Sequence, residues 1–118
     1  MDPRRVGTMK ENLACDYLQA KGYRILKRNF FCRNAEVDII AKSPENVLCF
    51  VEVKYRKDDR YGKACAAVDH RKRARIVRGA RVFLSGKDAY WNMAIRFDVI
   101  AIDGEEIQHV QHAFYAEE

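Results

Sequence analysis

The residues of this sequence best suited to chemistry are one aspartate and a Glu-Val-Lys triplet that follows it along the chain. Asp38 comes before a turn-forming segment, residues 42–46, and Glu52-Val53-Lys54 comes after it. A five-residue turn between two antiparallel strands pairs even-numbered positions with even-numbered positions. We therefore expect Asp38, Glu52 and Lys54 to point to the same face of a hairpin, together with Glu36.

Two carboxylates and an ammonium in this arrangement are suited to a divalent metal and a phosphate. Directly opposed residues of neighbouring strands have Cβ atoms about 5 Å apart, so Asp38 and Glu52 could hold one cation. Mg²⁺ (or Mn²⁺) takes a few such oxygens with waters and phosphate oxygens, and the Val53 carbonyl could add one. Such a metal neutralises charge on a phosphodiester and lowers the pKa of the attacking water. Lys54 would orient that water or hold the phosphate, and general-base action is left open.

An ordinary structural role explains the same spacing. The charged residues would then form the solvent-exposed face of an amphipathic hairpin, with a cross-strand ion pair. Against this, Ile40, Leu48 and Phe50 share the face of the charges, which indicates that both sides of the hairpin are covered. Charges on a covered face need a partner or a metal. Glu36 lies nearer the start of its strand, where an exposed charge is favoured over a second metal ligand.

The elements that must position these residues follow from hydrophobic periodicity and turn signals. We expect a helix over residues 8–21, a second helix from the N-cap Asp69 to about Leu84, and strands over residues 23–31, 36–41, 47–56, 94–102 and 107–114. Gly22 would end the first helix, whose core face would carry Met9, Leu13, Ala14, Tyr17 and Leu18. The order α-β-β-β-α-β-β predicts an α/β fold, a central mixed sheet flanked by helices.

Composition limits the class of protein. The 118 residues are expected to form a single domain, and 22 Lys and Arg against 17 Asp and Glu, with a pI of 9.1, favour a polyanionic partner. The four cysteines lie far apart, so no zinc knuckle or redox pair is indicated. His109 and His112 would face opposite sides of a strand and are expected at the surface, without a metal. Because no apolar leader or membrane span is present, we expect a cytoplasmic protein without a membrane partner.

The second helix carries most of the basic residues. Its apolar stripe is expected to be Ile76, Val77, Ala80, Phe83 and Leu84. The opposite face carries Arg71, Arg75, Arg78 and Arg81. DNA contact by this face is favoured over a role in solubility alone, because like charges along a helix repel one another and phosphates offset that repulsion. Lys72, at the border, is expected to reach into the active site, and Arg56 and Lys57 would extend the basic track.

Ordered motifs across most of the chain carry a family resemblance. They are Gly7 with Glu11 and Ala14, then Gly22-Tyr23-Arg24-Ile25-Leu26, Glu36-Val37-Asp38-Ile39-Ile40, Phe50-Val51-Glu52-Val53-Lys54, Lys72 with Ile76, and Arg96-Phe97-Asp98-Val99-Ile100. Over about residues 7–102 the chain resembles the YraN-like proteins, small bacterial proteins of uncharacterised function that are predicted endonucleases. It departs from their usual pattern at Lys10, Ala35 and Arg73.

The resemblance implies a restriction-endonuclease-like core, similar in layout to archaeal Holliday-junction resolvases. It also implies an active site built from Asp38, Glu52 and Lys54, with Glu11 as an additional acidic, metal-binding residue. An equally weighted alternative is that Thr8 and Glu11 form a capping box at the start of the first helix.

We therefore expect a magnesium-dependent endonuclease that hydrolyses DNA phosphodiester bonds and selects its substrates by structure, since no sequence-reading module is appended. The alternatives are a nucleic-acid-binding module that keeps the nuclease fold without cutting, and a protein-interaction domain. The two binding alternatives differ in salt dependence, which is steep only for phosphate contacts. Whether two copies act together as a homodimer is left open.

Overall fold

The computed structural model describes residues 3–55 and 69–116. The elements in chain order are α1 (Pro3–Ala20), β1 (Arg24–Cys32), β2 (Ala35–Lys42), β3 (Leu48–Tyr55), α2 (His70–Leu84), the short 3-10 helix η2 (Asp88–Tyr90), β4 (Ile95–Asp103) and β5 (Glu106–Phe114). The expected order of two helices and five strands is confirmed, and η2 is the one described element that the sequence did not predict.

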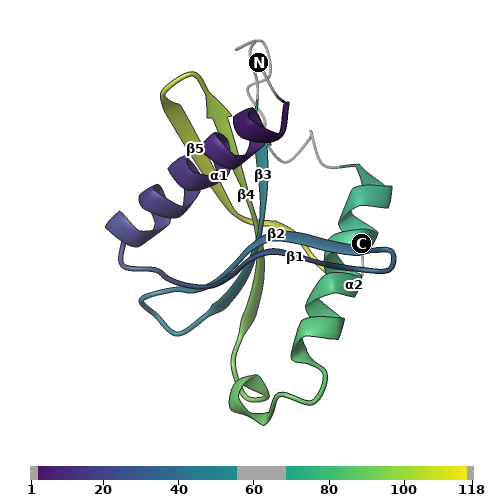
Figure 1. The fold of residues 1–118 in the computed structure, drawn as a ribbon. Coiled ribbons are helices and arrows are strands. Elements are labelled where there is room, and N and C mark those ends of the chain that lie inside the picture. The colour runs from purple at the N-terminus through teal and green to yellow at the C-terminus, as the bar shows by residue number, and fades with distance from the viewer. Residues whose placement is uncertain (1–2, 56–68, 117–118) are drawn as a thin grey trace.

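The five strands form one mixed sheet in the order β1-β2-β3-β4-β5. β3 and β4 pair in parallel, and the other neighbours pair antiparallel. A parallel pair needs a crossover connection, and α2 lies in it, as predicted. The protein therefore has the expected α/β fold with a restriction-endonuclease-like core, shown in Figure 1.

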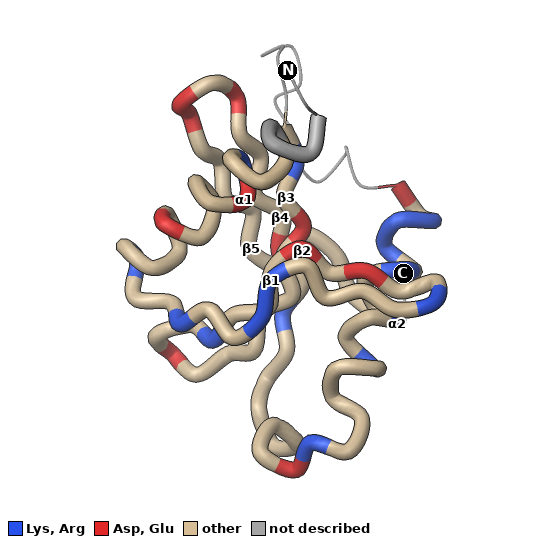
Figure 2. The backbone as a smooth tube through the Cα atoms, in the orientation of Figure 1, with Lys and Arg blue, Asp and Glu red and all other residues tan. Residues whose placement is uncertain are grey.

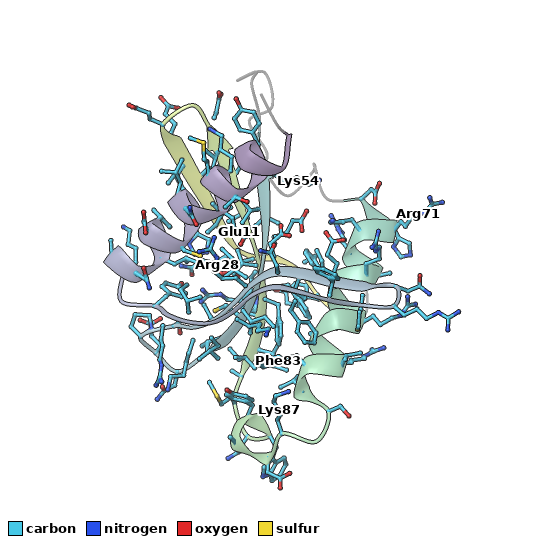
Figure 3. All side chains as sticks on the ribbon, in the orientation of Figure 1. Glu11, Arg28, Lys54, Arg71, Phe83 and Lys87 are labelled. Carbon is cyan, nitrogen blue, oxygen red and sulfur yellow. The ribbon has the colours of Figure 1, made fainter. Side chains whose placement is uncertain are left out.

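The two helices cover opposite faces of the sheet because the central strands are apolar on both sides. Leu48 and Phe50 of β3 belong to the buried cluster that also contains Phe83 of α2, labelled in Figure 3. Cys49 and Val51 belong to a second cluster, which contains the buried residues of α1. Burying each such side chain stabilises the fold by roughly 1.5–3 kcal/mol. The site on β2 and β3 is thus built on a strand pair packed on both faces.

The sequence signals at two helix ends are confirmed. Gly22 has φ +91°, and the Tyr23 N–H donates to the Leu18 carbonyl at 2.9 Å, which is the left-handed C-cap expected of a glycine there. Asp69 caps α2, because its Oδ1 accepts from the Lys72 N–H at 2.9 Å. Within residues 3–55 and 69–116, no helix combines the length and apolar character needed to cross a membrane.

The predicted start of the first helix is wrong, and its predicted core face is confirmed for Ala14, Tyr17 and Leu18 but wrong for Met9 and Leu13. α1 begins at Pro3, so Thr8 lies within the helix and the capping-box interpretation of Thr8 and Glu11 is excluded. Met9 and Leu13 are exposed, at 58% and 41%. The buried stripe is instead Glu11, Ala14, Cys15 and Leu18. The helix presents this stripe because the polar Glu11 has two hydrogen-bond partners on β1, which the apolar pattern alone does not reveal.

The close approach of α2 to β2 requires the glycine at position 79. A Cβ at Gly79 would lie 2.7 Å from Cγ2 of the fully buried Val37 and 3.3 Å from the Glu36 backbone nitrogen. Gly79→Ala is therefore expected to lower the free energy of unfolding by about 1–3 kcal/mol, measured by urea denaturation. The control is Gly7→Ala in α1, where a Cβ meets nothing within 4 Å. It is expected to be stabilising by up to about 1 kcal/mol. Equal effects of the two substitutions would contradict the close approach.

Candidate active site

The site forms where β2 parts from β3. The backbone pairs of these strands run from Lys42↔Leu48 to Ile39↔Val51, which confirms the predicted pairing of even with even positions. At the next position along, the Val53 N–H donates to Asp38 Oδ2 at 2.8 Å. The Asp38 carboxylate thus takes the place of the β2 backbone as the partner of β3, and the strands separate beyond it.

The carbonyl of Val53 belongs to the same gap. In an extended strand the N–H and C=O of one residue point to the same side, and the Val53 N–H points to Asp38. The Val53 carbonyl therefore faces the side from which β2 has withdrawn. This is the position that the predicted metal ligand set of Asp38, Glu52 and Val53 requires.

Asp38 and Glu52 form an acid pair in which Glu52 is buried and Asp38 is half-buried, and the two carboxyl groups influence each other's pKa. Glu52 is 2% exposed, and burial, together with the charge of Asp38, raises the pKa of Glu52 to about 8. Burial also raises the pKa of Asp38, partly offset by the hydrogen bonds from Val53 and Glu52. At neutral pH the Glu52 carboxyl group is therefore largely protonated. Glu52 Oε1 is buried without a hydrogen-bond partner.

Two ammonium groups flank the acid pair. Lys54 Nζ and Lys72 Nζ each lie 3.7 Å from Glu52 Oε2, so Lys72 does reach into the site from α2 as predicted. Burial alone would lower the pKa of Lys72, but its hydrogen bond to Glu36 and the nearby carboxylates raise it above its ordinary value. Lys72 is therefore a cation, which suits it to binding phosphate oxygens.

Glu36 is an ion-pair partner of two α2 residues. Its Oε1 accepts from Lys72 Nζ at 2.8 Å, and its Oε2 accepts from Arg75 Nη2 at 3.2 Å. The hydrogen bond from Lys72 lowers the pKa of Glu36, although partial burial opposes this. Glu36 is half-buried rather than the exposed strand-end charge that the sequence favoured. Its position explains how Lys72 is held beside Glu52.

Glu11 is anchored to β1. Its Oε1 accepts from Arg28 Nε at 3.0 Å and from Asn29 Nδ2 at 2.9 Å, and Figure 3 shows Glu11 beside Arg28. Glu11 also lines a pocket that contains Asp38. Within the described part of the chain, no three Asp, Glu, His or Cys side chains are placed to hold a metal together. Metal binding by Glu11 therefore stays a prediction.

The donor set nevertheless fits Mg²⁺. This ion is usually held by only one or two carboxylates, with waters and phosphate oxygens completing its shell. Asp38, Glu52 and the Val53 carbonyl offer such a set. Glu52 Oε1 is buried without a hydrogen-bond partner, so this oxygen is available to a cation. A divalent cation would also favour the ionised form of Glu52, which burial and the charge of Asp38 disfavour.

The basic face of α2 is only partly available to a ligand. Arg75 is bound to Glu36, and Arg78 Nη1 donates to the Asn34 carbonyl at 2.9 Å, so both contact the β1–β2 hairpin. Arg71 is exposed and points away from the sheet in Figure 3. Figure 2 shows Lys and Arg, in blue, gathered at the start of α2. The predicted DNA contacts Arg56 and Lys57 lie outside the described residues.

A buried network centred on Asp98 was not predicted. The fully buried Asp98 accepts from Arg96 Nε at 2.8 Å and Nη2 at 2.9 Å, and its Oδ2 lies 2.8 Å from His109 Nε2. Arg96 also donates to the Tyr23 hydroxyl at 2.6 Å. Burial alone would raise the pKa of Asp98, but His109 and Arg96 hold it below its usual value. The network joins β4, β5 and the start of β1.

The expectation of a surface His109 is therefore wrong, since its side chain is 5% exposed. The alternation of β4 contained a usable signal, because Asp98 shares its face with the apolar Ile100 and Ile102. A carboxylate on a buried face needs charged or hydrogen-bonding partners, and His109 is one of them.

The raised pKa of Glu52 predicts how the stability of the metal-free protein depends on pH. Between its ordinary value of 4.5 and about 8, folded Glu52 keeps a proton that the unfolded chain has released. The free energy of unfolding should therefore fall with rising pH across this window, by an amount on the order of a few kcal/mol. Urea titrations at successive pH values, with a chelator present, measure it. Glu52→Gln should remove most of the fall, and the exposed Glu45→Gln should retain it. Identical slopes in both variants would rule out the acid pair.

Comparison with known proteins identifies relatives along nearly the whole chain. The model of the uncharacterised protein family UPF0102 matches residues 10–102. A UPF0102 protein of Trichlorobacter lovleyi is 46% identical over 92% of this chain and 89% of its own length. UPF0102 proteins of Vibrio campbellii and Pseudomonas putida are 41% and 38% identical, over 93% and 95% of this chain and 92% and 94% of their own lengths.

The matched segment agrees with the extent of the YraN-like resemblance expected from the motifs. It contains Glu11, the acid pair and both flanking lysines. The chain belongs to the UPF0102 family.

Proposed function

We propose that this protein is a divalent-metal-dependent endonuclease that hydrolyses DNA phosphodiester bonds. The observation that supports it best is the acid pair Asp38–Glu52, in which the buried Glu52 has a raised pKa, an unpartnered oxygen and two ammonium groups beside it. Pairs of carboxyl groups with strongly shifted pKa values are costly to the fold and cluster at functional sites.

The residues of the site have distinct tasks in this proposal. Asp38 and Glu52 would hold Mg²⁺ or Mn²⁺, with Asp38 fixed by the Val53 N–H. The ion, when bound, supplies Lewis-acid activation of the phosphate and of the attacking water. In the hydrolysis, the water oxygen bonds to phosphorus, one P–O ester bond breaks, and a proton from the water ends on the leaving oxygen. Lys54 and Lys72 would bind the non-bridging phosphate oxygens, whose negative charge increases in the transition state.

Charge favours a nucleic acid as the substrate. The chain carries a formal net charge of +5, and Lys72 brings one positive charge from α2 directly to the acid pair. Arg71, one residue before it, is exposed. A phosphodiester bound at the acid pair could therefore contact Lys72 while a neighbouring phosphate contacts Arg71.

A non-catalytic nucleic-acid-binding module is the second candidate. Among the described residues, the candidate site has two carboxylates, and no three Asp, Glu, His or Cys side chains are placed to hold a metal together. This favours a module that binds nucleic acid without a metal. Such a module would need Lys54 and Lys72 for phosphate binding but would not need Asp38 as a ligand.

Removing the Asp38 charge should separate the two candidates. Asp38→Asn is expected to lower the cleavage rate with Mg²⁺ by more than about a hundredfold, because even the outer partners of metal ligands typically contribute ten- to hundredfold. The rate is measured by gel-based nicking of supercoiled and branched DNA, and affinity by fluorescence anisotropy. DNA affinity measured in a chelator should be unchanged or higher, since a negative charge is lost.

The matched control for this experiment is Glu45→Gln, an exposed carboxylate in the β2–β3 turn, which should leave both measurements unchanged. A wild-type protein that cuts no DNA with either Mg²⁺ or Mn²⁺ would refute the endonuclease proposal. DNA binding without any cleavage would then support the binding module.

The salt dependence of binding tests the role of α2. If Arg71 contacts one phosphate of duplex DNA, Arg71→Ala should reduce the slope of log affinity against log salt by about 0.9. The control is Arg24→Ala, an exposed arginine that pairs with Lys42 at the far end of the β1–β2 ladder. Equal slopes for the wild type and the Arg71 variant would exclude the phosphate contact.

A further inference from the structure

A pocket of about 710 Å³ adjoins the acid pair on the side of α1. Asp38 lines it, and so do Lys10 and Glu11 of α1, Asn29 and Phe31 of β1 and Tyr55 of β3. We call it the aromatic pocket. Its volume is within the range of pockets that hold small organic groups. Of its lining residues, only Asp38 and Val53 take part in the proposed hydrolysis.

Two aromatic side chains give the pocket its character. Phe31 and Tyr55 are exposed, at 71% and 39%, although each is carried by a strand whose neighbouring positions are paired in the sheet. Lys10 Nζ lies 4.3 Å from the centroid of the Tyr55 ring, a cation–π contact that fixes this ring beside the pocket. Exposed rings beside a cation are the combination by which proteins bind unpaired bases.

The charges of the pocket decide which part of a nucleotide it suits. Asp38, Glu11 and Lys10 are all part of its wall, and Glu11 is ion-paired with Arg28. The Asp38 carboxylate opposes the Lys10 ammonium, so the wall offers a phosphate no surplus of positive charge. The ammonium groups of Lys54 and Lys72 lie instead beside Glu52, and neither lysine lines the pocket. A phosphate is therefore favoured beside the lysines, and an uncharged base is favoured in the aromatic pocket.

A base can enter such a pocket only when it is not stacked within a duplex. Extruding a paired base costs a few kcal/mol, whereas a bulged or single-stranded base is already free to enter. We infer that the aromatic pocket binds one unpaired nucleobase of the DNA strand whose phosphodiester lies at Asp38. This rests on the proposed function and gives its substrate class: DNA that carries unpaired nucleotides.

The experiment compares two labelled DNAs of equal length, a perfect duplex and the same duplex with one unpaired adenine. Affinities are measured by fluorescence anisotropy in a chelator, so that no cleavage occurs. The wild type should bind the bulged DNA more tightly. Phe31→Ala and Tyr55→Ala should each weaken binding to the bulged DNA by about five- to a hundredfold, the usual loss of one base–aromatic stack, and should leave binding to the perfect duplex nearly unchanged.

The matched control is Trp91→Ala, because Trp91 is 81% exposed but follows η2 and does not line the pocket. Its loss should change neither affinity. Circular dichroism melting of all three variants checks that they fold, which their exposure favours. The inference is overturned by equal wild-type affinities for the two DNAs, by undetectable binding of both, or by pocket variants that behave like Trp91→Ala.

Failure of the pocket and failure of the proposed function give different results. If bulged DNA is preferred through Phe31 and Tyr55 but nothing is cut with Mg²⁺ or Mn²⁺, the endonuclease proposal is refuted and the base pocket stands. If cleavage of DNA requires Asp38 but DNA binding and cleavage do not depend on Phe31 or Tyr55, base binding by the aromatic pocket is refuted and the endonuclease proposal stands.

Discussion

The hydrogen bond from the Val53 N–H to the Asp38 carboxylate is the interaction on which the candidate site depends. A strand that leaves its neighbour exposes backbone groups that must find other partners. Here a side chain supplies the partner, so β2 can part from β3 without leaving the Val53 N–H unsatisfied. The same bond places a carboxylate at the point of separation, next to Glu52. One contact therefore satisfies the Val53 N–H and also places the Asp38 carboxylate in the candidate site.

The acid pair formed in this way is costly, and the surrounding residues limit the cost. Glu52 keeps a proton, and Lys54 and Lys72 contribute positive charge. Lys72 can do so because α2 lies close to β2 at Gly79, two turns later on the same side of the helix. A fold selected for stability alone would replace such a cluster with apolar side chains. Its retention of a buried acid with an unpartnered oxygen is the pattern of a site that binds a ligand.

The sequence predicted those parts of the structure that follow from strand pairing and local signals. The turn length predicted that even positions pair with even positions, which places Asp38 and Glu52 on one face, although the observed turn is residues 43–47 rather than 42–46. Gly22 and Asp69 marked helix ends correctly. The predictions that failed concern buried polar residues. The capping-box alternative for Glu11 and the surface position of His109 are wrong, because periodicity treats polar residues as solvent-facing and cannot name partners on distant strands.

The two sides of the acid pair differ in a way that bears on selectivity. On the side of α2, the Lys72 ammonium lies beside the Glu52 carboxylate, and contacts of an ammonium with phosphate are insensitive to nucleotide sequence. On the side of α1, Glu11 is already neutralised by Arg28, and the exposed rings of Phe31 and Tyr55 line the aromatic pocket. Under the proposed function, affinity would come from the first side and discrimination from the second. Because one nucleotide carries its phosphate and its base on different sides of the sugar, a strand that passes Asp38 can engage both sides at once only where its base is unpaired.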